Sequence, residues 1–454
     1  MNEHKKHGSS FSSKMGFILA AAGSAVGLGN LWRFPYLAAK YGGGSFLLIY
    51  VILAVTFGFA LMITEIALGR KTGKSALYAF STLHEKCGFI GILASIVPII
   101  ILPYYCVIGG WVIKFAWAFL TGSGNAAAAD DYFSNFIART GEPVMWLVFF
   151  ILATSVVILL GVNKGIENIS KVLMPLLVVL SVIIAVFVVT RPGAGAGIVY
   201  YLKPDLSKIS ANAFLAALGQ LFYSMSLAMG IMITYGSYMK KNEDIESSVR
   251  NIEIFDTGIA FLAGLMIVPA VFVFSGGDQA SLKAGPTLMF ITLPKVFASM
   301  GFGTATGIVF FILVLLAALT SAVSLMETSV STFMDELHWS RKKCCGLMVV
   351  IMIVLGTASS MGYGLLDFIR IFGMNFLDFF DFMTNSVMMP LAALATCILI
   401  LRVVGIDGMV KEIEQSSPFR RKKLYRVFIK YFAPICLIII LLSSIANVLG
   451  IISM

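Results

Sequence analysis

Charged residues are scarce in this chain of 454 residues. Asp, Glu, Lys and Arg make up 12% of it, against about 25% in soluble domains, whereas hydrophobic residues make up 59% and the mean hydropathy is +0.94. This composition excludes an ordinary soluble domain and predicts a polytopic membrane protein. The net charge of +10 does not indicate nucleic-acid binding, because the basic residues lie in short loops.

Cysteine and histidine are also few. Most of the six cysteines lie in or beside apolar runs, and they show no metal-type spacing. The pair Cys344–Cys345 falls in an expected cytoplasmic loop, where thiols stay reduced. The four histidines lie near the N-terminus, at His84 and at His338. We therefore expect no disulfide framework and no metal cluster, and no nucleophile–base set indicates an enzyme.

Long apolar runs, by contrast, are numerous, and eleven of them are long enough to cross a bilayer. They cover residues 15–39, 44–68, 88–120, 143–161, 166–190, 211–238, 251–276, 303–333, 345–361, 375–402 and 427–452. We expect an all-α membrane protein with eleven transmembrane helices in a single domain over residues 1–454. The first run is expected to remain as a span, because it has no small-residue cleavage site.

The basic residues gather in alternate loops between these runs. With the N-terminus in the cytoplasm, roughly two-thirds of the Lys and Arg fall on the cytoplasmic side, as the positive-inside rule requires. An odd number of spans then places the C-terminus outside. We expect a multi-pass protein of a bacterial plasma (inner) membrane.

Two of the runs are interrupted in the middle. Residues 22–36 (AGSAVGLGNLWRFPY) and 219–230 (GQLFYSMSLAMG) each place glycine, serine or asparagine at membrane depth. Interrupting a membrane helix exposes backbone N–H and C=O groups that need another partner, most often a bound ion or substrate. The breaks are five spans apart, which predicts two inverted five-helix repeats, 15–190 and 211–402, and an additional helix at 427–452.

The motifs around these breaks resemble the neurotransmitter:sodium symporters. The resemblance covers almost the whole chain and rests on GSAVGLGNLWRFPY, YGGGSFLLIY (41–50), TEIALGR (64–70), GQLFYSMSLAMG and LAALTSAVSLMET (316–328). Bacterial members of that family are amino-acid transporters with the LeuT fold. The resemblance therefore implies this fold, with broken first and sixth helices, and the transport of an amino acid with sodium.

The resemblance implies two sodium sites. One would use the carbonyl oxygens of Gly23, Val26 and Ala317 and the hydroxyls of Thr320 and Ser321. Sodium is a hard cation that takes about five or six oxygen ligands, and these groups supply them without a buried charge. Taken alone, Thr320 and Ser321 would more often bond back to a helix carbonyl.

The other sodium site would use the Ala25 carbonyl, Asn30, Ser224 and Asp256, together with the substrate carboxylate. Asp256 departs from the family pattern. Many members have Asn there and need chloride, and others carry Glu at the position of Ala260. We expect the Asp256 carboxylate to supply this charge, so that no chloride is needed. A carboxylate at membrane depth is costly unless paired or protonated, which leaves a protonated structural Asp as the alternative.

The substrate is expected to bring its own carboxylate. The backbone amides near Leu28 and Gly29 offer a positive helix end, and Tyr105 resembles the tyrosine that bonds the carboxylate. Gly27 stands where biogenic-amine transporters carry Asp, so it offers no charge to a bare amine. The matching pocket favours a hydrophobic or aromatic side chain, and its residues are Ser24, Ala25, Leu28, Gly29, Ile101, Tyr105, Tyr223, Ser224, Ser226, Met229, Ser321 and Leu325.

The resemblance also implies gates. Arg33 and Asp381 resemble the outer pair, and Asp335 resembles the acid of the inner gate. The usual arginine partner of Asp335 is replaced by Gly8, so its cation is left open among Lys5, Lys6 and His7. Gly165 and Pro175 enclose nine residues whose helix is loosened, either to open a water path to a sodium site or as a static kink.

The chain is thus predicted to be a sodium-coupled symporter of L-amino acids with hydrophobic or aromatic side chains, working by alternating access. Two alternatives stay open: a proton-coupled transporter in which Asp256 carries the proton, and an amino-acid sensor or channel of the same fold. Besides the bilayer and the amino acid, no obligate protein partner is inferred. The sequence names neither the preferred amino acid nor the oligomeric state.

Overall fold

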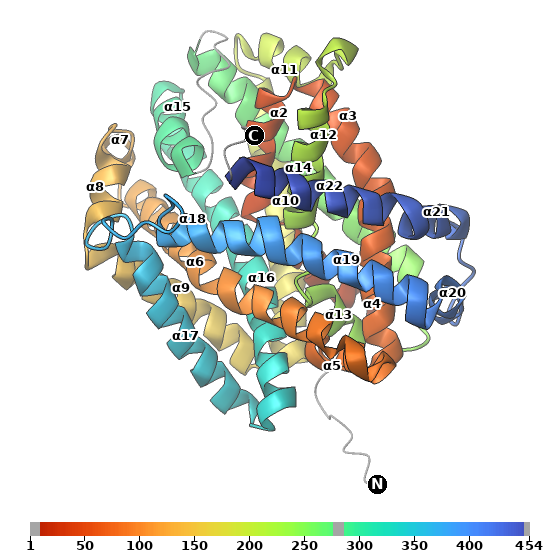
Figure 1. The fold of residues 1–454 in the computed structure, drawn as a ribbon. Helices are drawn as coiled ribbons and strands as arrows, with labels where there is room; N and C mark the ends of the chain where they lie inside the picture. Colours follow the sequence, from red (N-terminus) through yellow and green to blue (C-terminus); the bar gives the residue numbers. More distant parts are fainter. Residues whose placement is uncertain (1–9, 276–285, 449–454) are drawn as a thin grey trace.

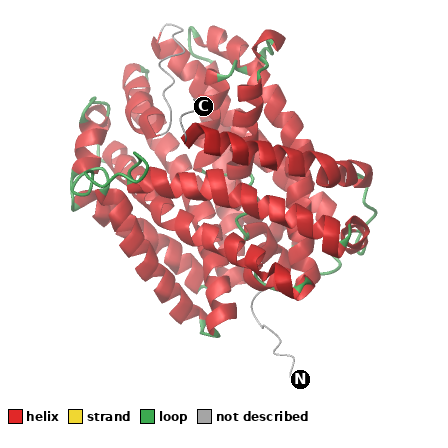
Figure 2. Cartoon of the chain, viewed as in Figure 1, coloured by secondary structure: helices red, strands yellow, loops and turns green. Residues whose placement is uncertain are grey.

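The computed structural model describes residues 10–275 and 286–448, and helices form nearly all of this part (Figure 1; Figure 2). Across these two ranges no β-strand occurs, and the only β-type pairing is an isolated bridge between Ile371 and Met374. The expected all-α class is therefore confirmed.

Nine spans in the described residues are long and apolar enough to cross a membrane, and several contain a short π-helical or 3-10 segment, labelled η. They are α3–η2–α4 (Gly44–Leu53, Ala54–Gly58, Phe59–Thr72), η3–α6 (Glu85–Cys87, Gly88–Leu120), α9 (Glu142–Leu159), η4–α10 (Val162–Glu167, Asn168–Val189), α14 (Ile245–Ser275), α16 (Gly303–Leu337), α17 (Arg341–Met361), α18–η8–α19–η9 (Phe376–Asp381, Phe382–Met388, Met389–Leu399, Ile400–Val404) and α21–η10–α22 (Lys422–Val427, Phe428–Phe432, Ala433–Val448).

The first apolar run is bent. Helix α1 (Lys14–Ala25) ends before residues 26–28, and the chain resumes as η1 (Gly29–Arg33) and α2 (Phe34–Lys40) at an angle of 51°. Counting this pair as one, the described residues provide up to ten spans by length and composition. Residues 211–238 form two short helices, α12 (Ala211–Ser224) and α13 (Ile231–Ser237), instead of one long span. The boundaries of the two repeats stay a prediction.

The second break is held in an unusual backbone conformation. Ser226, Ala228 and Gly230 have φ of 52°, 58° and 70°, in the left-handed region that only glycine adopts easily. The cost is offset by hydrogen bonds to other helices. The Ala228 N–H donates to Glu65 Oε1 of α4 at 2.7 Å, and Ser226 Oγ donates to the Ser24 carbonyl at 2.9 Å.

Shorter helices connect the spans. They are α5 (Ala76–Leu83), α7 (Gly124–Ala127), α8 (Tyr132–Ala138), α11 (Ala194–Leu202), η5 (Leu206–Lys208), η7–α15 (Leu288–Thr292, Leu293–Ser299) and α20 (Ile406–Ile413). In Figure 1, α11 and α15 lie at the top of the view and α5 lies at the bottom. Helix α1 packs against α10, α14 and α16, which puts the first break inside the bundle.

The glycines of the YGGG motif let two chain segments approach closely. Gly42 and Gly43 have φ of 89° and 56°, and a Cβ on Gly43 would overlap the Tyr200 carbonyl of α11. Beside them, Ser45 Oγ donates to the Asp205 carbonyl at 2.7 Å and accepts from the Asp205 N–H at 2.9 Å. The turn between α2 and α3 is thereby fixed to the loop that leads into α12.

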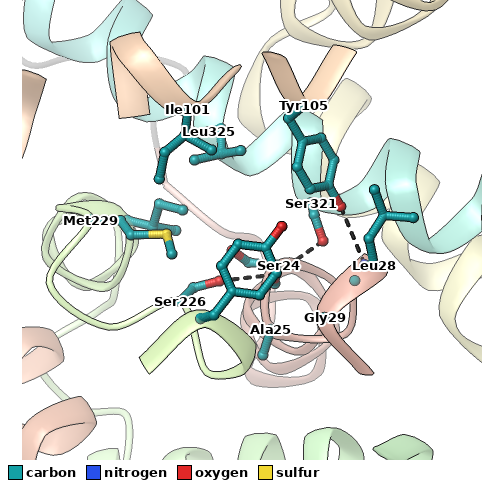
Figure 3. Close-up of a pocket in the computed structure, with 13 residues that line it drawn as sticks. Ser24, Ala25, Leu28, Gly29, Ile101, Tyr105, Ser226, Met229, Ser321 and Leu325 are labelled. Atoms are coloured by element: carbon teal, nitrogen blue, oxygen red, sulfur yellow. Dashed lines mark hydrogen bonds between the residues drawn. The ribbon is translucent and has the colours of Figure 1, made fainter. Parts of the chain in front are cut away.

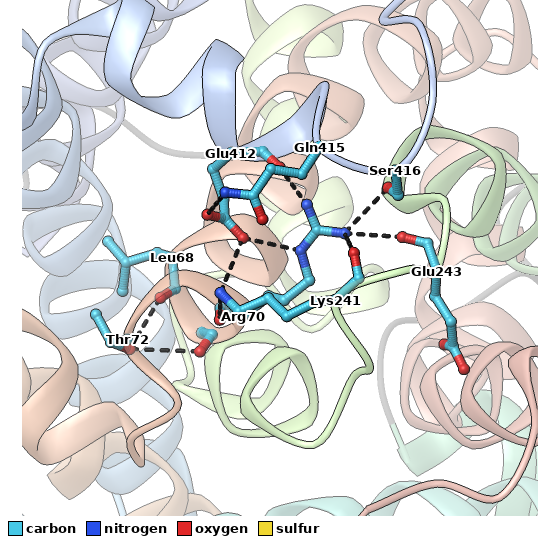
Figure 4. Close-up of polar contacts among 9 residues, drawn as sticks. Leu68, Arg70, Thr72, Lys241, Glu243, Glu412, Gln415 and Ser416 are labelled. Carbon is cyan, nitrogen blue, oxygen red and sulfur yellow. Dashed lines mark hydrogen bonds and ion pairs between the residues drawn. The ribbon is translucent and has the colours of Figure 1, made fainter.

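A buried arginine in the last turn of α4 joins three segments of the chain (Figure 4). The Arg70 guanidinium, 0% exposed, pairs with Glu412 Oε1 of α20 at 2.9 Å. It also donates to the Glu243 carbonyl at 2.8 Å and to Ser416 Oγ at 3.1 Å. Because arginine has five donors in a fixed plane, one side chain can bind α20 and the α13–α14 connection at once.

Candidate functional site

A cavity lies between the two breaks (Figure 3). Its walls come from both broken segments and from α6 and α16. The lining residues are Ser24, Ala25, Gly27, Leu28, Gly29, Ile101, Tyr105, Tyr223, Ser226, Met229, Ile231, Ser321 and Leu325. The structure thus brings together every predicted substrate residue except Ser224. Gly27 and Ile231 also line the cavity, although the sequence interpretation did not list them.

The polar end of this cavity lies at the first break. The Tyr105 hydroxyl accepts from the Leu28 N–H at 3.4 Å, and Ser321 Oγ donates to the Ser24 carbonyl at 3.1 Å (Figure 3). Ser24 Oγ in turn donates to Ser226 Oγ of the second break at 3.1 Å. Exposed helix-end groups and hydroxyls therefore meet on one side of the cavity, where they can bind the charged end of a zwitterion.

The opposite side of the cavity is apolar. In Figure 3, Ile101, Leu325 and Met229 lie together, away from the Tyr105 hydroxyl. All three side chains are buried, at 1%, 4% and 4% exposure. Such a wall accommodates a hydrocarbon or aromatic group and offers no charge to a polar one.

A side chain at either of the two glycines nearest the polar end would contact other side chains of the site. A Cβ on Gly27 would lie 2.6 Å from Ser321 Oγ and 3.1 Å from the Tyr105 hydroxyl. A Cβ on Gly29 would lie 2.5 Å from the Tyr223 ring. A side chain at Gly27 would thus have to displace the Ser321 hydroxyl, and it would occupy space that faces Tyr105.

Three of the four predicted residues of one sodium site meet at a buried carboxylate, and the fourth, Ala25, lines the cavity. Asp256, which is 0% exposed, accepts from Asn30 Nδ2 at 2.8 Å and from Ser224 Oγ at 2.7 Å through Oδ1. Its Oδ2 accepts from the Tyr50 hydroxyl at 3.0 Å. No cationic side chain among the described residues forms an ion pair with Asp256. A buried negative charge with neutral neighbours and several oxygen atoms suits a hard monovalent cation.

Gln220 adds a second indication next to the first break. Its Nε2 donates to the Gly29 carbonyl at 2.9 Å, whereas its Oε1 is buried and has no hydrogen-bond partner in the described residues. Buried acceptors of this kind are rare, because the lost hydrogen bond to water costs about 1–3 kcal/mol. An oxygen in this state beside the first break fits a site that binds an ion or an ordered water.

The predicted residues of the other sodium site also lie together. Ser321 Oγ lies 3.3 Å from the carbonyl oxygens of both Gly23 and Val26. Thr320 Oγ1 lies 3.1 Å from the Ala317 carbonyl, one of two α16 carbonyls to which it bonds back. A cation between α1 and α16 would therefore find three carbonyls and two hydroxyls, with no charged ligand.

The outer-gate residues face a second, larger cavity. Its lining includes Arg33, Asp381 and Tyr223, the last of which also lines the first cavity. The Arg33 guanidinium lies 5.7 Å from the centre of the Tyr223 ring. Asp381 accepts from Tyr104 and Asn385, and it makes no direct ion pair with Arg33 in the described structure.

The structure describes only some of the predicted inner-gate residues. Asp335 Oδ2 accepts from the Ser75 N–H at 3.3 Å, while Lys5, Lys6, His7 and Gly8 lie outside the described residues. Gly165 falls in the π-helical turn η4, and Pro175 falls inside α10. A Cβ on Gly165 would overlap the Val157 carbonyl, so glycine is needed for packing there.

One polar residue of the site was missed from the sequence. Glu65 is buried in α4, and it receives the Ala228 N–H of the second break. Its other oxygen, Oε2, has no partner within the described ranges. The signal was present, because an acidic residue inside an apolar span is costly and marks a functional position.

Comparison with known proteins decides the family. The model of the sodium:neurotransmitter symporter family matches residues 8–125 and 126–451. The chain belongs to this family. Its relatives include the uncharacterized sodium-dependent transporter YhdH of Bacillus subtilis, with 34% identity over 98% of both chains. Another is the uncharacterized sodium-dependent transporter MJ1319 of Methanocaldococcus jannaschii, with 32% identity over 97% of this chain and 91% of that protein.

A solved structure fixes the fold. The structure of MhsT in complex with L-phenylalanine aligns with a TM-score of 0.87 and 36% identity, over 96% of this chain and 99% of that chain. This sodium:neurotransmitter symporter thus has the LeuT-type fold with broken helices, and it is a sodium-dependent, multi-pass membrane transporter. The predicted family and the all-α LeuT-type fold are confirmed, whereas the count of eleven transmembrane helices stays a prediction, because the described residues provide nine spans, or up to ten with the bent pair.

Proposed function

We propose that this transporter takes up L-amino acids with hydrophobic or aromatic side chains, together with two sodium ions and without chloride. The observation that carries the proposal is the buried Asp256 carboxylate, held by Asn30, Ser224 and Tyr50 beside the substrate cavity. A site that gathers two cations and a zwitterion needs a fixed negative charge, because water cannot screen it at membrane depth.

The polar end of the cavity supports a substrate with a carboxylate. The Leu28 N–H and the Tyr105 hydroxyl face it, and Gly27 supplies no acidic side chain. A free amine without a carboxylate would find no counter-charge there. An α-amino acid would place its carboxylate near Tyr105 and the sodium ion of the Asp256 cluster, where charge-assisted bonds are strong.

The apolar wall of Ile101, Met229 and Leu325 supports a large hydrophobic side chain. Methionine is flexible and polarisable, so it adapts to aliphatic and aromatic groups alike. The relative MhsT was solved in complex with L-phenylalanine, an amino acid of this class.

Alternating access would use the two ends of the broken helices. Arg33 and Asp381 would close above Tyr223 from the larger cavity, which we assign to the outside. The end of the bundle that carries α5 and α20 would face the cytoplasm, with the N-terminus inside and the C-terminus outside. The location is the plasma membrane, and no obligate protein partner is proposed.

Two other functions make different predictions. If Asp256 carried a proton in place of sodium, a proton gradient alone would drive uptake. If the protein were a sensor or channel, it would bind amino acids but never concentrate them. The Asp256 cluster favours the first alternative over the second, because a carboxylate with three neutral donors can hold either ion.

The test is uptake of radiolabelled L-phenylalanine into proteoliposomes, with competition by each of the other nineteen amino acids in chloride and in gluconate buffer. The proposal expects competition by Leu, Ile, Met, Tyr and Trp, weak competition by charged amino acids, and equal uptake in both buffers. Uptake that stops in gluconate, or competition led by Asp, Lys or Gly, would contradict it.

A further inference from the structure

A buried glutamate holds the start of the first helix against the start of α10. Glu167, the last residue of η4, is 0% exposed. Its Oε2 accepts from the Ser12 N–H at 2.7 Å, and its Oε1 accepts from Ser13 Oγ at 3.1 Å and from the Ser12 hydroxyl. Lys171 Nζ, one turn further along, pairs with the same oxygen at 2.7 Å. Ser12 and Ser13 lie more than 150 residues away in the chain.

The contact is placed where a carboxylate binds most strongly. Ser13 caps α1 by accepting from the Gly16 N–H at 3.1 Å, so Glu167 lies at the N-terminal end of this helix. The helix dipole favours negative charge at that end. The fit is also tight, because a Cβ on Gly16 would overlap the Glu167 side chain. The place of Glu167 at the helix end, its negative charge and its close fit against Gly16 therefore all favour its contact with α1.

Other groups complete the closure around this point. Lys240, just past α13, donates to the Ser12 carbonyl at 3.0 Å. The preceding residue, Phe11, is 1% exposed and packs edge-on against Phe17 and Tyr235 at 5.5 Å. Residues 11–13 thus join α1, α10 and the α13 connection at the end of the bundle that faces away from the larger cavity.

We propose that Glu167 is an inner latch and acts as a positioning residue for transport. It keeps α1 docked on η4 while the substrate cavity faces the outside, and its bonds must break before the cavity opens to the cytoplasm. The proposal rests on the proposed function, since it assigns this end to the cytoplasm. Glu167 is itself the last residue of the π-helical turn η4 and lies two residues after Gly165. Release of α1 and loosening of α10 are therefore one event.

The test compares two cysteine reporters in a cysteine-free background that retains uptake. One reporter replaces Ser170, which is 4% exposed and lies one turn beyond Glu167 in α10. The other replaces Ser386, which lines the larger cavity. Labelling rates by a small, membrane-impermeant maleimide are measured in detergent, with sodium and with choline.

Glu167→Gln removes the charge and keeps one acceptor. The latch predicts that it speeds labelling at position 170 by about tenfold and slows labelling at position 386, because weakening the closed state moves the population toward the inward-facing one. Glu167→Asp, which keeps the charge, should bring both labelling rates part of the way back to those of the parent protein. A variant that is merely destabilised would speed labelling at both positions.

The matched control is Glu142→Gln. Glu142 also pairs with a lysine, Lys114 at 2.6 Å, but it lies at the start of α9, away from α1. It should leave both reporters unchanged. If Glu167→Gln does not reach the membrane, Lys240→Met removes only the bond to Ser12 and should shift both reporters in the same directions by about twofold.

The outcomes separate the latch from the proposed function. Reporters that respond to sodium in the parent protein but not to Glu167→Gln would overturn the latch and leave the proposed function standing. Equal acceleration at both positions would also overturn it. Reporters that respond to Glu167→Gln but not to sodium would support the latch and contradict sodium coupling.

Discussion

Asn30 Nδ2 lies 2.8 Å from Asp256 Oδ1, and this contact joins the first broken helix to α14 at the centre of the bundle. The same amide nitrogen lies 2.9 Å from Ser224 Oγ of the second break. The three residues come from three separate spans, and an ion bound among them would affect the position of each. This relationship makes Asp256 the residue on which the account depends most.

We expect Asp256→Asn either to abolish transport or to make it dependent on chloride. The substitution keeps the shape of the side chain but removes the charge that balances the bound cations. Uptake of the variant is measured in chloride and in gluconate. Once its ions leave, the wild-type carboxylate is expected to take up a proton. Internal acid should therefore speed the return of the empty wild-type carrier but not of the variant. A variant indifferent to both chloride and internal pH would contradict this role.

Replacing Thr320 and Ser321 together with Ala should raise the sodium concentration for half-maximal uptake at least about tenfold, since each lost oxygen ligand costs about 1–3 kcal/mol. Thr328→Ala is a matched control, because Thr328 Oγ1 bonds only to the Ser324 carbonyl of its own helix. Unchanged sodium dependence in the double variant would show that the second sodium site lies elsewhere.

Tyr105→Phe should weaken L-phenylalanine binding by about tenfold, because it removes a charge-assisted hydrogen bond to the substrate carboxylate. Binding of L-tyrosine should exceed that of tyramine, which lacks the carboxylate, by a much larger factor. Isothermal titration in saturating sodium measures both. Comparable affinities for tyrosine and tyramine would refute the argument from Gly27 and Tyr105.

Arg70→Ala should destabilise the fold by about 3–5 kcal/mol, because it leaves the buried Glu412 carboxylate with only the exposed Lys241 as a cationic partner. Arg426→Ala, which removes an exposed pair with Asp407, should change stability by about 1 kcal/mol or less. Thermal unfolding in detergent compares the two. Equal shifts of the unfolding temperature in the two variants would show that the buried Arg70 pair stabilises the fold no more than the exposed Arg426 pair.

The sequence predicted those parts of the site that depend on breaks in apolar runs. Gly23 to Asn30 and Ser224 to Gly230 interrupt helices visibly, so their convergence follows from the inverted repeat and the resemblance. Ser224 was assigned both to the substrate pocket and to a sodium site, and the structure places it against Asp256 and not in the lining of the cavity. Spacing along α12 cannot decide which of two adjoining sites a side chain faces.

Contacts between distant segments outside the two breaks could not be predicted. Nothing in the pattern around Glu167 indicates that it meets Ser12 and Ser13, because that pairing depends on how α1 packs against η4. The Arg70–Glu412 pair is similar, with partners 342 residues apart. The sixth predicted span, 211–238, is a different case, since its two halves, α12 and α13, are each too short to count as a span by length and hydropathy.

The most direct measurement is the accumulation of L-phenylalanine inside proteoliposomes under an inward sodium gradient, with equimolar choline as the control. The account predicts an internal concentration several times the external one in sodium gluconate, which collapses when the gradient is dissipated with a sodium ionophore. Accumulation that is equal in choline, or that never exceeds the external concentration in sodium, would contradict sodium-coupled symport.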